Sequence, residues 1–256
     1  MATRDAAPLG APCWIDLWTS DVEGSRKFYS ALLGWEAGDP DPNFGGYWMF
    51  HHGGVPVAGG MGPMDDMTPN NAWKTYFATA DIAATAKSAV ERGATLFGEP
   101  MPVADMGMQA VLADPLGADL GTWQPGTFQG FSVLGEPGAP SWFELMTPDY
   151  ERSLEFYTSV FGWRTEVISD TAELRYTVVS DAQGDQIAGV MDSSKMDPEG
   201  GSSWLVYWGV ADINEGMASV VDLGGTVFAG PIETEYGRMA WAVDPFGAKF
   251  NLHAAL

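Results

Sequence analysis

Short stretches in which apolar and polar residues alternate recur along the chain, and this period of two predicts β-strands. Two apolar patterns of helical period follow such strands, and they run from Asp21 to Gly34 and from Asp81 to Gly93. Aspartate caps the first turn of a helix, and glycine favours its end. β-branched runs broken by glycine come after each predicted helix. Each quarter of the chain therefore predicts a βαβββ module.

The first half of the chain recurs in the second half. Residues 14–21 match residues 142–149 in register, and the Asp-Pro-x-Gly run at 114–117 returns at 244–247. Further matched pairs are Trp73 with Trp204 and Tyr76 with Tyr207. So many matches in register indicate a duplication. We therefore expect two tandem domains, residues 10–126 and 140–256, joined by a Gly- and Pro-rich linker at residues 127–139.

Four of these features together resemble the vicinal oxygen chelate superfamily: a strand that ends in Asp21, a helix with Phe28-Tyr29, the pair Gly34-Trp35, and a closing Asp-Pro-x-Gly strand. That superfamily includes glyoxalase I, extradiol dioxygenases and bleomycin-resistance proteins, and the resemblance covers nearly the whole chain. It implies an α+β fold in which four βαβββ modules form two domains. Each domain would be a curled, mostly antiparallel sheet around a cavity, with the helices outside. The function stays open, because one fold serves many chemistries.

The resemblance also implies a divalent metal, held by His and Glu on the inner strands. The corresponding positions hold indole, hydroxyl, amide, aliphatic and glycine residues here: Trp14, Thr75 and Gly121 in the first domain, and Trp142, Val206 and Asn251 in the second. Indole, glycine and valine do not coordinate such metals. We therefore expect no metal and no other cofactor.

The charge balance narrows the range of partners. The chain has 34 acidic and 12 basic residues, for a formal net charge of −22. Such a protein repels phosphate backbones and anionic lipid head groups, so we expect neither nucleic acid nor membrane as a partner. A neutral or cationic small molecule suits the charge better. With the single cysteine Cys13 and no apolar leader or membrane span, we expect a soluble, cytoplasmic protein.

The alternation of faces predicts which side chains line the cavities. In the first domain these are Trp14, Asp16 and Trp18, then Thr75, Phe77 and Thr79, and then Asp119, Gly121 and Trp123. In the second domain they are Trp142, Glu144 and Met146, then Val206, Trp208 and Val210, and then Lys249, Asn251 and His253. From these we take as ligand-binding candidates Trp14, Asp16, Trp18, Phe77, Trp123, Trp142, Glu144, Trp208 and Asn251.

Asp16 and Glu144 stand at matching positions, each within an aromatic strand. An inward carboxylate is costly to bury unless something pairs with it. It can be satisfied by a backbone amide, or its side chain can lie on the other face of the strand. Otherwise it can bind an ammonium group beside the indoles, or it can act as a general base with a raised pKa. His253 is either a surface histidine or a third acid–base candidate. The catalytic candidates are thus Asp16, Glu144 and His253, with no role assigned.

These observations favour metal-independent binding of a hydrophobic aromatic small molecule, neutral or cationic. The chain is also similar to double-domain actinomycete proteins, some of which belong to aromatic-polyketide antibiotic pathways. That similarity implies an anthracycline-like ligand, bound for sequestration, for resistance or to assist a tailoring enzyme, which is then a candidate partner. The alternative is a metal-independent lyase, isomerase or cofactorless oxygenase or hydroxylase acting on such a compound. A third hypothesis is a structural protein with collapsed cavities. The sequence leaves a monomer and a homodimer open.

Overall fold

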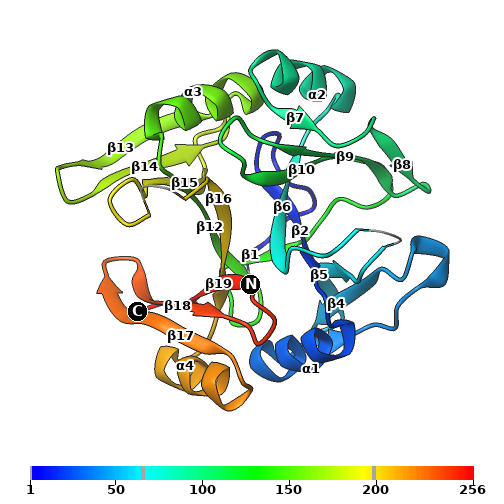
Figure 1. Ribbon diagram of the computed structural model, residues 1–256, viewed down its shortest axis with the longest axis vertical. Coiled ribbons are helices and arrows are strands. Elements are labelled where there is room, and N and C mark those ends of the chain that lie inside the picture. The colour runs from blue at the N-terminus through cyan, green and yellow to red at the C-terminus, as the bar shows by residue number, and fades with distance from the viewer. Residues whose placement is uncertain (1, 65–66, 198–199) are drawn as a thin grey trace.

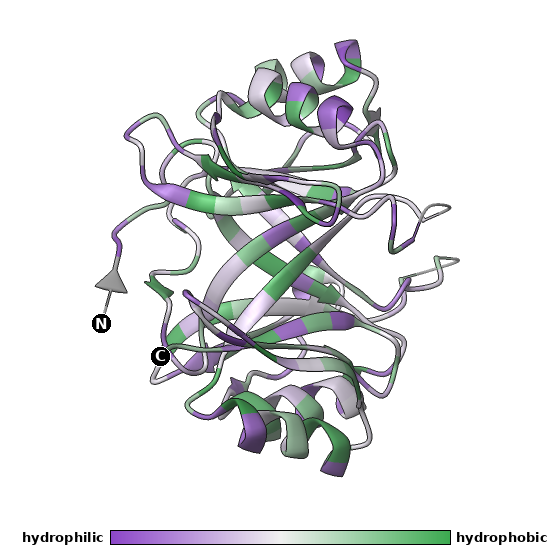
Figure 2. Ribbon diagram, turned by 90° about the vertical axis from the view of Figure 1, so that its left-hand side faces the viewer, coloured by the Kyte–Doolittle hydropathy of each residue, from purple (hydrophilic) through white to green (hydrophobic). Residues whose placement is uncertain are grey.

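The computed structural model describes residues 2–64, 67–197 and 200–256. Two large mixed sheets stand side by side, and the helices lie at the outer corners of the molecule (Figure 1). Seen from the side, the helices form the top and bottom layers and the strands lie between them (Figure 2). This is the predicted pair of tandem, sheet-dominated domains. Among the described residues, no helix is long and apolar enough to cross a membrane.

The sheet of the N-terminal domain runs in the order β3-β4-β5-β2-β6-β10-β9-β7, and β8 also pairs with β9. Its strands are β2 (Pro12–Trp18), β3 (Glu36–Ala37), β4 (Trp48–His52), β5 (Val55–Met61), β6 (Ala72–Ala78), β7 (Thr95–Leu96), β8 (Met101–Val103), β9 (Gly107–Ala113) and β10 (Asp119–Pro125). Its helices are α1 (Val22–Leu33) and α2 (Ile82–Glu91), with a short 3₁₀ turn η1 (Pro42–Phe44).

The sheet of the C-terminal domain repeats this plan in the order β13-β14-β15-β12-β16-β19-β18-β17. Its strands are β12 (Pro140–Thr147), β13 (Arg164–Asp170), β14 (Arg175–Ser180), β15 (Gln186–Asp192), β16 (Ser203–Gly209), β17 (Thr226–Thr234), β18 (Gly237–Val243) and β19 (Lys249–Ala254), and its helices are α3 (Tyr150–Phe161) and α4 (Ile213–Asp222). The short strand β1 (Ala2–Thr3) pairs with β11 (Val133–Leu134), which lies within the linker. In both large sheets the antiparallel pairs outnumber the parallel ones, as expected.

The helices begin where the sequence predicts. The side chain of Asp21 accepts a hydrogen bond from the backbone N–H of Gly24, and that of Asp81 accepts one from Ala84, which are N-caps. Gly34 ends α1 in the left-handed region at φ 69°. Aspartates cap α3 and α4 in the same way.

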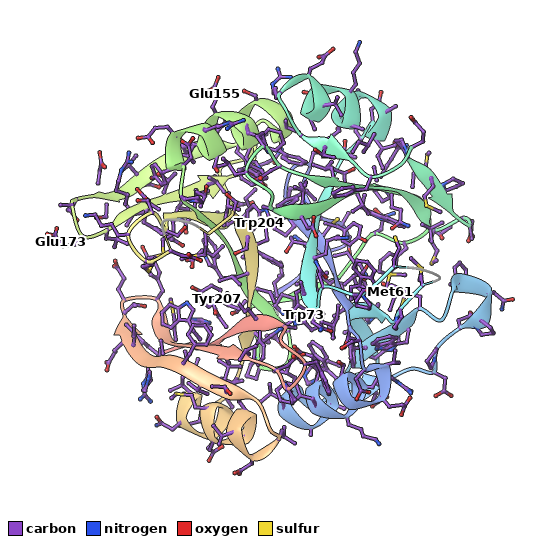
Figure 3. The ribbon with its side chains drawn as sticks, viewed as in Figure 1. Met61, Trp73, Glu155, Glu173, Trp204 and Tyr207 are labelled. Carbon is purple, nitrogen blue, oxygen red and sulfur yellow. The ribbon has the colours of Figure 1, made fainter. Side chains whose placement is uncertain are left out.

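The two domains share one aromatic core. Strands β6 and β16 pack against each other, α1 contacts α4, and α2 contacts α3. Trp73 of the N-terminal domain lies 5.1 Å from Trp208 of the C-terminal domain between ring centroids, and Phe77 lies 4.9 Å from Trp204. Figure 3 shows Trp73 and Trp204 near the centre of the molecule. Many of the tryptophans therefore belong to the contact between the domains rather than to a cavity.

Two matching hydrogen-bond chains join the domains. The Tyr29 hydroxyl on α1 donates to Asp244 Oδ2 of the C-terminal domain over 3.0 Å and accepts from Trp73 Nε1, also over 3.0 Å. In the mirror arrangement, the Tyr157 hydroxyl donates to Asp114 Oδ2 over 3.1 Å and accepts from Trp204 Nε1 over 2.8 Å. The tyrosine of the Phe-Tyr pair in α1 and in α3 thus binds the Asp-Pro-x-Gly turn of the other domain.

The predicted face of one strand in each domain is wrong. In the structure Trp14 lies opposite Tyr76, and Trp142 lies opposite Tyr207. Phe77 and Trp208 point to the other side of their sheets, into the shared core. A β-bulge between Pro12 and Trp14, and a second between Pro140 and Trp142, shift the register by one residue. Because side chains alternate, one residue of slip moves a whole strand's pattern to the opposite face.

The side chains at the two bulges explain their position. Cys13 Sγ donates to the main-chain oxygen of Tyr76 over 3.3 Å, and Ser141 Oγ donates to that of Tyr207 over 3.1 Å. Cys13 is buried and free of any disulfide. Its visible role is to support the bulge that turns Trp14 toward the concave face.

Candidate functional site

The concave face of the C-terminal sheet carries a group of four polar aromatic and acidic side chains, which we name the C-terminal tetrad: Trp142, Glu144, Tyr176 and Tyr207. The Tyr207 hydroxyl donates to Glu144 Oε1 over 2.9 Å, and Trp142 Nε1 donates to the Tyr176 hydroxyl over 3.0 Å. Glu144 is 5 % exposed. Figure 3 shows Tyr207 on the side of its sheet away from Trp73.

The N-terminal sheet carries the matching group, the N-terminal tetrad: Trp14, Asp16, Tyr47 and Tyr76. Asp16 Oδ1 accepts from Trp14 Nε1 over 2.8 Å and from the Tyr47 hydroxyl over 2.6 Å. The Tyr76 hydroxyl adds a third stabilising contact. The carboxylate of Asp16 is thus satisfied by donors of its own domain, and these are side chains rather than backbone amides.

Glycines on the neighbouring strands make room for the tyrosine rings. A Cβ atom on Gly59 of β5 would collide with the Tyr47 hydroxyl, and one on Gly189 of β15 would collide with the Tyr176 hydroxyl. Glycine is therefore required at both places by close approach rather than by backbone conformation. Each tyrosine fills the space at the centre of its concave face.

The two carboxyl groups differ in their electrostatic surroundings. Burial raises the pKa of Glu144 to about 7, against the opposing hydrogen bonds of Tyr207 and Tyr176, and no cation contributes. Burial also raises the pKa of Asp16, but three hydrogen bonds and the charge of Lys74 oppose it. Lys74 lies directly opposite Asp16 on β6. Leu205 takes the corresponding place opposite Glu144. A group that changes protonation near neutral pH is therefore found at the C-terminal tetrad.

The linker between the domains packs against Trp14 of the N-terminal tetrad. The ring of Phe128 packs against Trp14 with 4.8 Å between centroids and against Trp123 with 6.1 Å. Trp123 Nε1 donates to the Phe128 carbonyl over 3.0 Å. Trp14 is only 5 % exposed. Two residues proposed for ligand stacking, Trp14 and Trp123, do lie on the concave face, but the protein's own chain already packs against them.

On the C-terminal concave face the indole that corresponds to Trp14 is less covered. Trp142 is half-buried, and within the described residues it makes no ring–ring contact. The register places Trp142, Tyr207, Asn251 and Trp241 in one row across four adjacent strands, all on the concave face. Half-buried side chains around this row are Met146, Met191, Met239 and Trp241. The face therefore offers two indoles and several thioethers around a polar floor.

The remaining sequence candidates lie apart from one another. Trp18 is half-buried on the N-terminal concave face, and its Nε1 donates to the Gly62 carbonyl over 3.0 Å. His253 shares the concave face with Asn251, and its Nε2 lies 2.9 Å from the Tyr236 carbonyl. The three acid–base candidates are thus not assembled into one site, because Asp16 belongs to the other domain and His253 binds a backbone carbonyl.

The residues on the concave faces do not fit the metal that the fold family implies. Each concave face has a single central carboxyl group, Asp16 or Glu144, and the residues around it are indoles, phenols, glycines and one amide, which are poor ligands for such ions. Within residues 2–64, 67–197 and 200–256, no cluster of three or more His, Cys, Asp and Glu side chains could hold a metal ion. We derive no chemical step through a metal.

Two surface pockets lie away from the concave faces. One, of about 370 Å³, is formed by residues 78–81, the exposed side of α2 and Phe161, and the other, of about 270 Å³, lies along α2 near Pro100. Neither contains a residue of the tetrads. The concave faces are occupied at their centres by their own tyrosine rings, so a ligand would meet the outer, half-buried side chains.

Sequence reasoning missed the four tyrosines of the tetrads. Tyr76 and Tyr207 recur in the internal repeat, and this recurrence was the available signal. The bulges concealed their direction. Tyr47 directly precedes β4 and Tyr176 lies on β14, and each reaches a buried glycine of the next strand, a contact that a sequence pattern alone does not reveal.

Comparisons with known proteins agree with this architecture. Residues 139–252 match the family model described as the glyoxalase/bleomycin resistance protein/dioxygenase superfamily, and residues 13–120 match that of a glyoxalase-like domain. The chain is 34% identical to the anthracycline biosynthesis protein DauV of Streptomyces sp. (strain C5), over 95% of this chain and 92% of the relative. It is 32% identical to the putative glyoxylase CFP32 of Mycobacterium bovis, over 98% and 97%.

Solved structures show the same fold at low identity. The Mn(II)-bound glyoxalase from Novosphingobium aromaticivorans superposes with a TM-score of 0.66 at 16% identity, over 96% of this chain and 82% of the other. The dioxygenase LapB from Pseudomonas sp. KL28 gives a TM-score of 0.63 at 16% identity, over 97% and 93%. The paired βαβββ modules, the matched halves and the relatives at this coverage lead to one conclusion: the chain belongs to the glyoxalase/bleomycin resistance protein/dioxygenase superfamily.

Proposed function

We propose that this protein binds a polycyclic aromatic small molecule of the anthracycline class, without a metal, on the concave face of its C-terminal domain. The observation that carries the proposal is the row of Trp142, Tyr207, Asn251 and Trp241, in which Trp142 and Asn251 stand at positions that the sequence resemblance assigned to metal ligands. The names of two relatives, the anthracycline biosynthesis proteins DauV and DnrV, support the ligand class. The role would be to sequester a pathway compound or to assist a tailoring enzyme.

The spacing of the row suits a flat ligand of several rings. Adjacent strands lie about 4.8 Å apart, so two indoles separated by two intervening strands are roughly 14 Å apart at the backbone. Aromatic contacts contribute about 0.5–1.5 kcal/mol each beyond the area they bury. Half-buried methionines adapt to the outline of an apolar ligand. Trp142 and Trp241 would flank such a ligand while Met146 and Met239 contact its faces.

The N-terminal concave face has a structural role in this proposal. Phe128 covers Trp14 and Trp123, and Asp16 already has its hydrogen-bond donors. These contacts leave no need for a ligand ammonium group at Asp16. The overall charge of −22 still attracts a cationic ligand to the molecule as a whole.

The test is a calorimetric titration of chelator-treated protein with an anthracycline, its aglycone and a small monocyclic phenol. We expect the two polycyclic ligands to bind without metal. Trp142→Ala and Trp241→Ala should each weaken binding by about 1–3 kcal/mol. Trp18→Ala, a half-buried indole on the N-terminal face, is the matched control and should have no effect. If Trp18→Ala lost binding and Trp142→Ala kept it, the ligand would bind the N-terminal domain and the proposal would be wrong.

A second candidate function rests on Glu144. Burial raises the pKa of its carboxyl to about 7, and a group that titrates near the working pH is suited to general acid–base catalysis. The protein would then be a metal-independent lyase, isomerase or oxygenase acting on a similar compound. Incubating the ligand with the protein and following its chemical conversion by chromatography decides between the two. Turnover that Glu144→Gln abolishes while binding persists would favour the enzyme over the binding protein.

A further inference from the structure

The turn of the β17–β18 hairpin bends over the concave face of the C-terminal sheet. It runs from Thr234 to Gly237, and a Cβ atom on Gly237 would collide with the imidazole ring of His253. His253 Nε2 also lies 2.9 Å from the Tyr236 carbonyl oxygen. Because a carbonyl oxygen can only accept, Nε2 donates this hydrogen bond. The backbone of the turn thus rests directly on a ring of the concave face.

The same turn reaches toward the other side of the sheet. Four strands, β15, β12, β16 and β19, separate β14 from β18 in the sheet order. Burial is the main cause of the raised pKa of Tyr176 on β14, and Glu144 and Tyr236 of the turn add to the rise. In Figure 1, β17 and β18 lie across the open side of this sheet from β13, β14 and β15. The turn therefore lies over the concave face between these two groups of strands.

The matching turn of the N-terminal domain, between β8 and β9, is fixed more firmly. Its Gly107 lies over the Trp123 ring as Gly237 lies over His253. The linker binds it through four hydrogen bonds, in which Gly126 N and Phe128 N donate to the Met106 carbonyl, and Thr127 N and Oγ1 donate to the Asp105 carbonyl. Among the described residues, the bond from His253 is the one hydrogen bond that ties residues 235–236 to a residue outside their hairpin.

The strand that leads into the C-terminal turn is irregular. The pairing of β17 with β18 shifts register between Val227 and Ala229 and again between Ala229 and Ile232. Such bulges interrupt the ladder of hydrogen bonds and bend the strand. The Ile232 and Tyr236 side chains are 48 % and 54 % exposed, so few contacts hold this end of the hairpin. Local opening costs least where buried contacts are few.

We infer that the turn between Thr234 and Gly237 is a gate over the C-terminal concave face, and that His253 is the positioning residue that holds it closed. The inference rests on the proposed function and supplies its route of entry. A flat ligand reaches Met239 and Trp241 when the hydrogen bond to the Tyr236 carbonyl breaks. The gate closes over the empty and the occupied face alike. His253 then acts through the turn and not as an acid–base catalyst.

Hydrogen–deuterium exchange of the ligand-free protein tests the gate. His253→Leu removes the donor, so the amides of residues 234–237 should exchange about fivefold faster or more. His253→Gln carries an amide donor at the same number of bonds from the backbone and should stay close to the wild type. The β8–β9 turn, residues 103–107, is the internal control and should be unchanged in both variants. Equal exchange in His253→Leu and the wild type would overturn the inference.

Binding rates distinguish a gate from a ligand contact. Stopped-flow fluorescence with doxorubicin, a fluorescent anthracycline, gives the association and dissociation rate constants. His253→Leu should raise both by a similar factor, about fivefold, and leave Kd nearly unchanged, because the same turn closes over both states. His253→Gln should restore the wild-type rates. Far-UV circular dichroism confirms that both variants fold.

The outcomes separate the two proposals. If doxorubicin does not bind the wild type, the proposed function fails, and the exchange data show independently whether His253 holds the turn. If doxorubicin binds and His253→Leu changes the dissociation rate constant alone, His253 is a ligand contact and the gate is overturned alone. Unchanged rate constants in His253→Leu would overturn it as well.

Discussion

The fold buries the carboxyl group of Glu144 without a cation beside it. This burial lowers the free energy of unfolding by an amount that depends on pH. Its pKa rises from the ordinary 4.5 to about 7 in the folded protein. Between these values the unfolded chain has lost the proton while the folded protein keeps it. The free energy of unfolding contributed by this residue therefore decreases as the pH rises from about 4.5 to about 7, and is constant above that.

Replacing Glu144 by Gln should remove this pH dependence. The amide cannot ionise and still accepts from Tyr207, so the variant should be more stable than the wild type above neutral pH, by up to about 3 kcal/mol, and similar to it in acid. Urea unfolding at several pH values measures the difference. Glu155→Gln, an exposed position on α3 (Figure 3), is the control and should leave the pH profile unchanged. A Glu144→Gln profile that parallels the wild type would contradict the raised pKa.

At the residue scale, the sequence predicted the helix starts but not the face on which every side chain lies. Helix starts at Asp21 and Asp81 depend on local hydrogen bonds, and the spacing alone located them. The faces of Phe77 and Trp208 depend on bulges that a regular alternation does not reveal. The packing of Phe128 on Trp14 depends on where the linker returns in space. Glu144 and Asn251 lie on the predicted face, while their binding role stays a prediction.

At the scale of elements, α1 and α3 are each joined to the opposite domain by one tyrosine. Tyr29 and Tyr157 are both fully buried, and each hydroxyl lies between a tryptophan N–H and an aspartate oxygen. Burial raises the pKa of Asp114 and of Asp244, and the turn's own backbone amides and the tyrosine hydrogen bond oppose that rise.

Tyr29→Phe and Tyr157→Phe should each lower the free energy of unfolding by about 1–3 kcal/mol, because each leaves a buried indole N–H and a buried carboxyl oxygen without a partner. Chemical denaturation measures the loss. Tyr236→Phe, in which the ring is 54 % exposed, is the matched control and should change stability little. The two core variants should add in the double mutant, since their hydrogen-bond chains share no residue. If Tyr29→Phe were as stable as the control, the hydrogen bonds of Tyr29 across the domain contact would contribute nothing to stability.

At the scale of the whole molecule, the two halves have one hydrophobic core between them. Trp208 is fully buried, and the neighbours that cover it include Trp35 and Trp73 of the other half. Separating the halves would expose these rings along with Phe77 and Phe250. The domain boundaries at residues 126 and 140 remain a prediction from the sequence. They do not imply that either half is stable alone.

Thermal unfolding should therefore be a single transition. In differential scanning calorimetry we expect the calorimetric and van't Hoff enthalpies to agree, as for one cooperative unit. A fragment of residues 140–256 expressed alone should be unfolded or aggregated, since it would expose its share of the aromatic core. Two resolved transitions, with one retained in the fragment, would contradict this expectation.

The reciprocal tyrosine–aspartate contacts have the symmetry of an isologous dimer, in which the same patch of each partner meets the other. In this chain both patches are encoded in one polypeptide, so their meeting is intramolecular, with an effective concentration in the millimolar range for a short linker. A pair of separate chains would dissociate on dilution, whereas this pairing is independent of how much protein is present. The two halves share this pairing while their concave faces differ: Phe128 of the linker packs on Trp14, whereas Trp142 is half-buried and makes no ring–ring contact among the described residues.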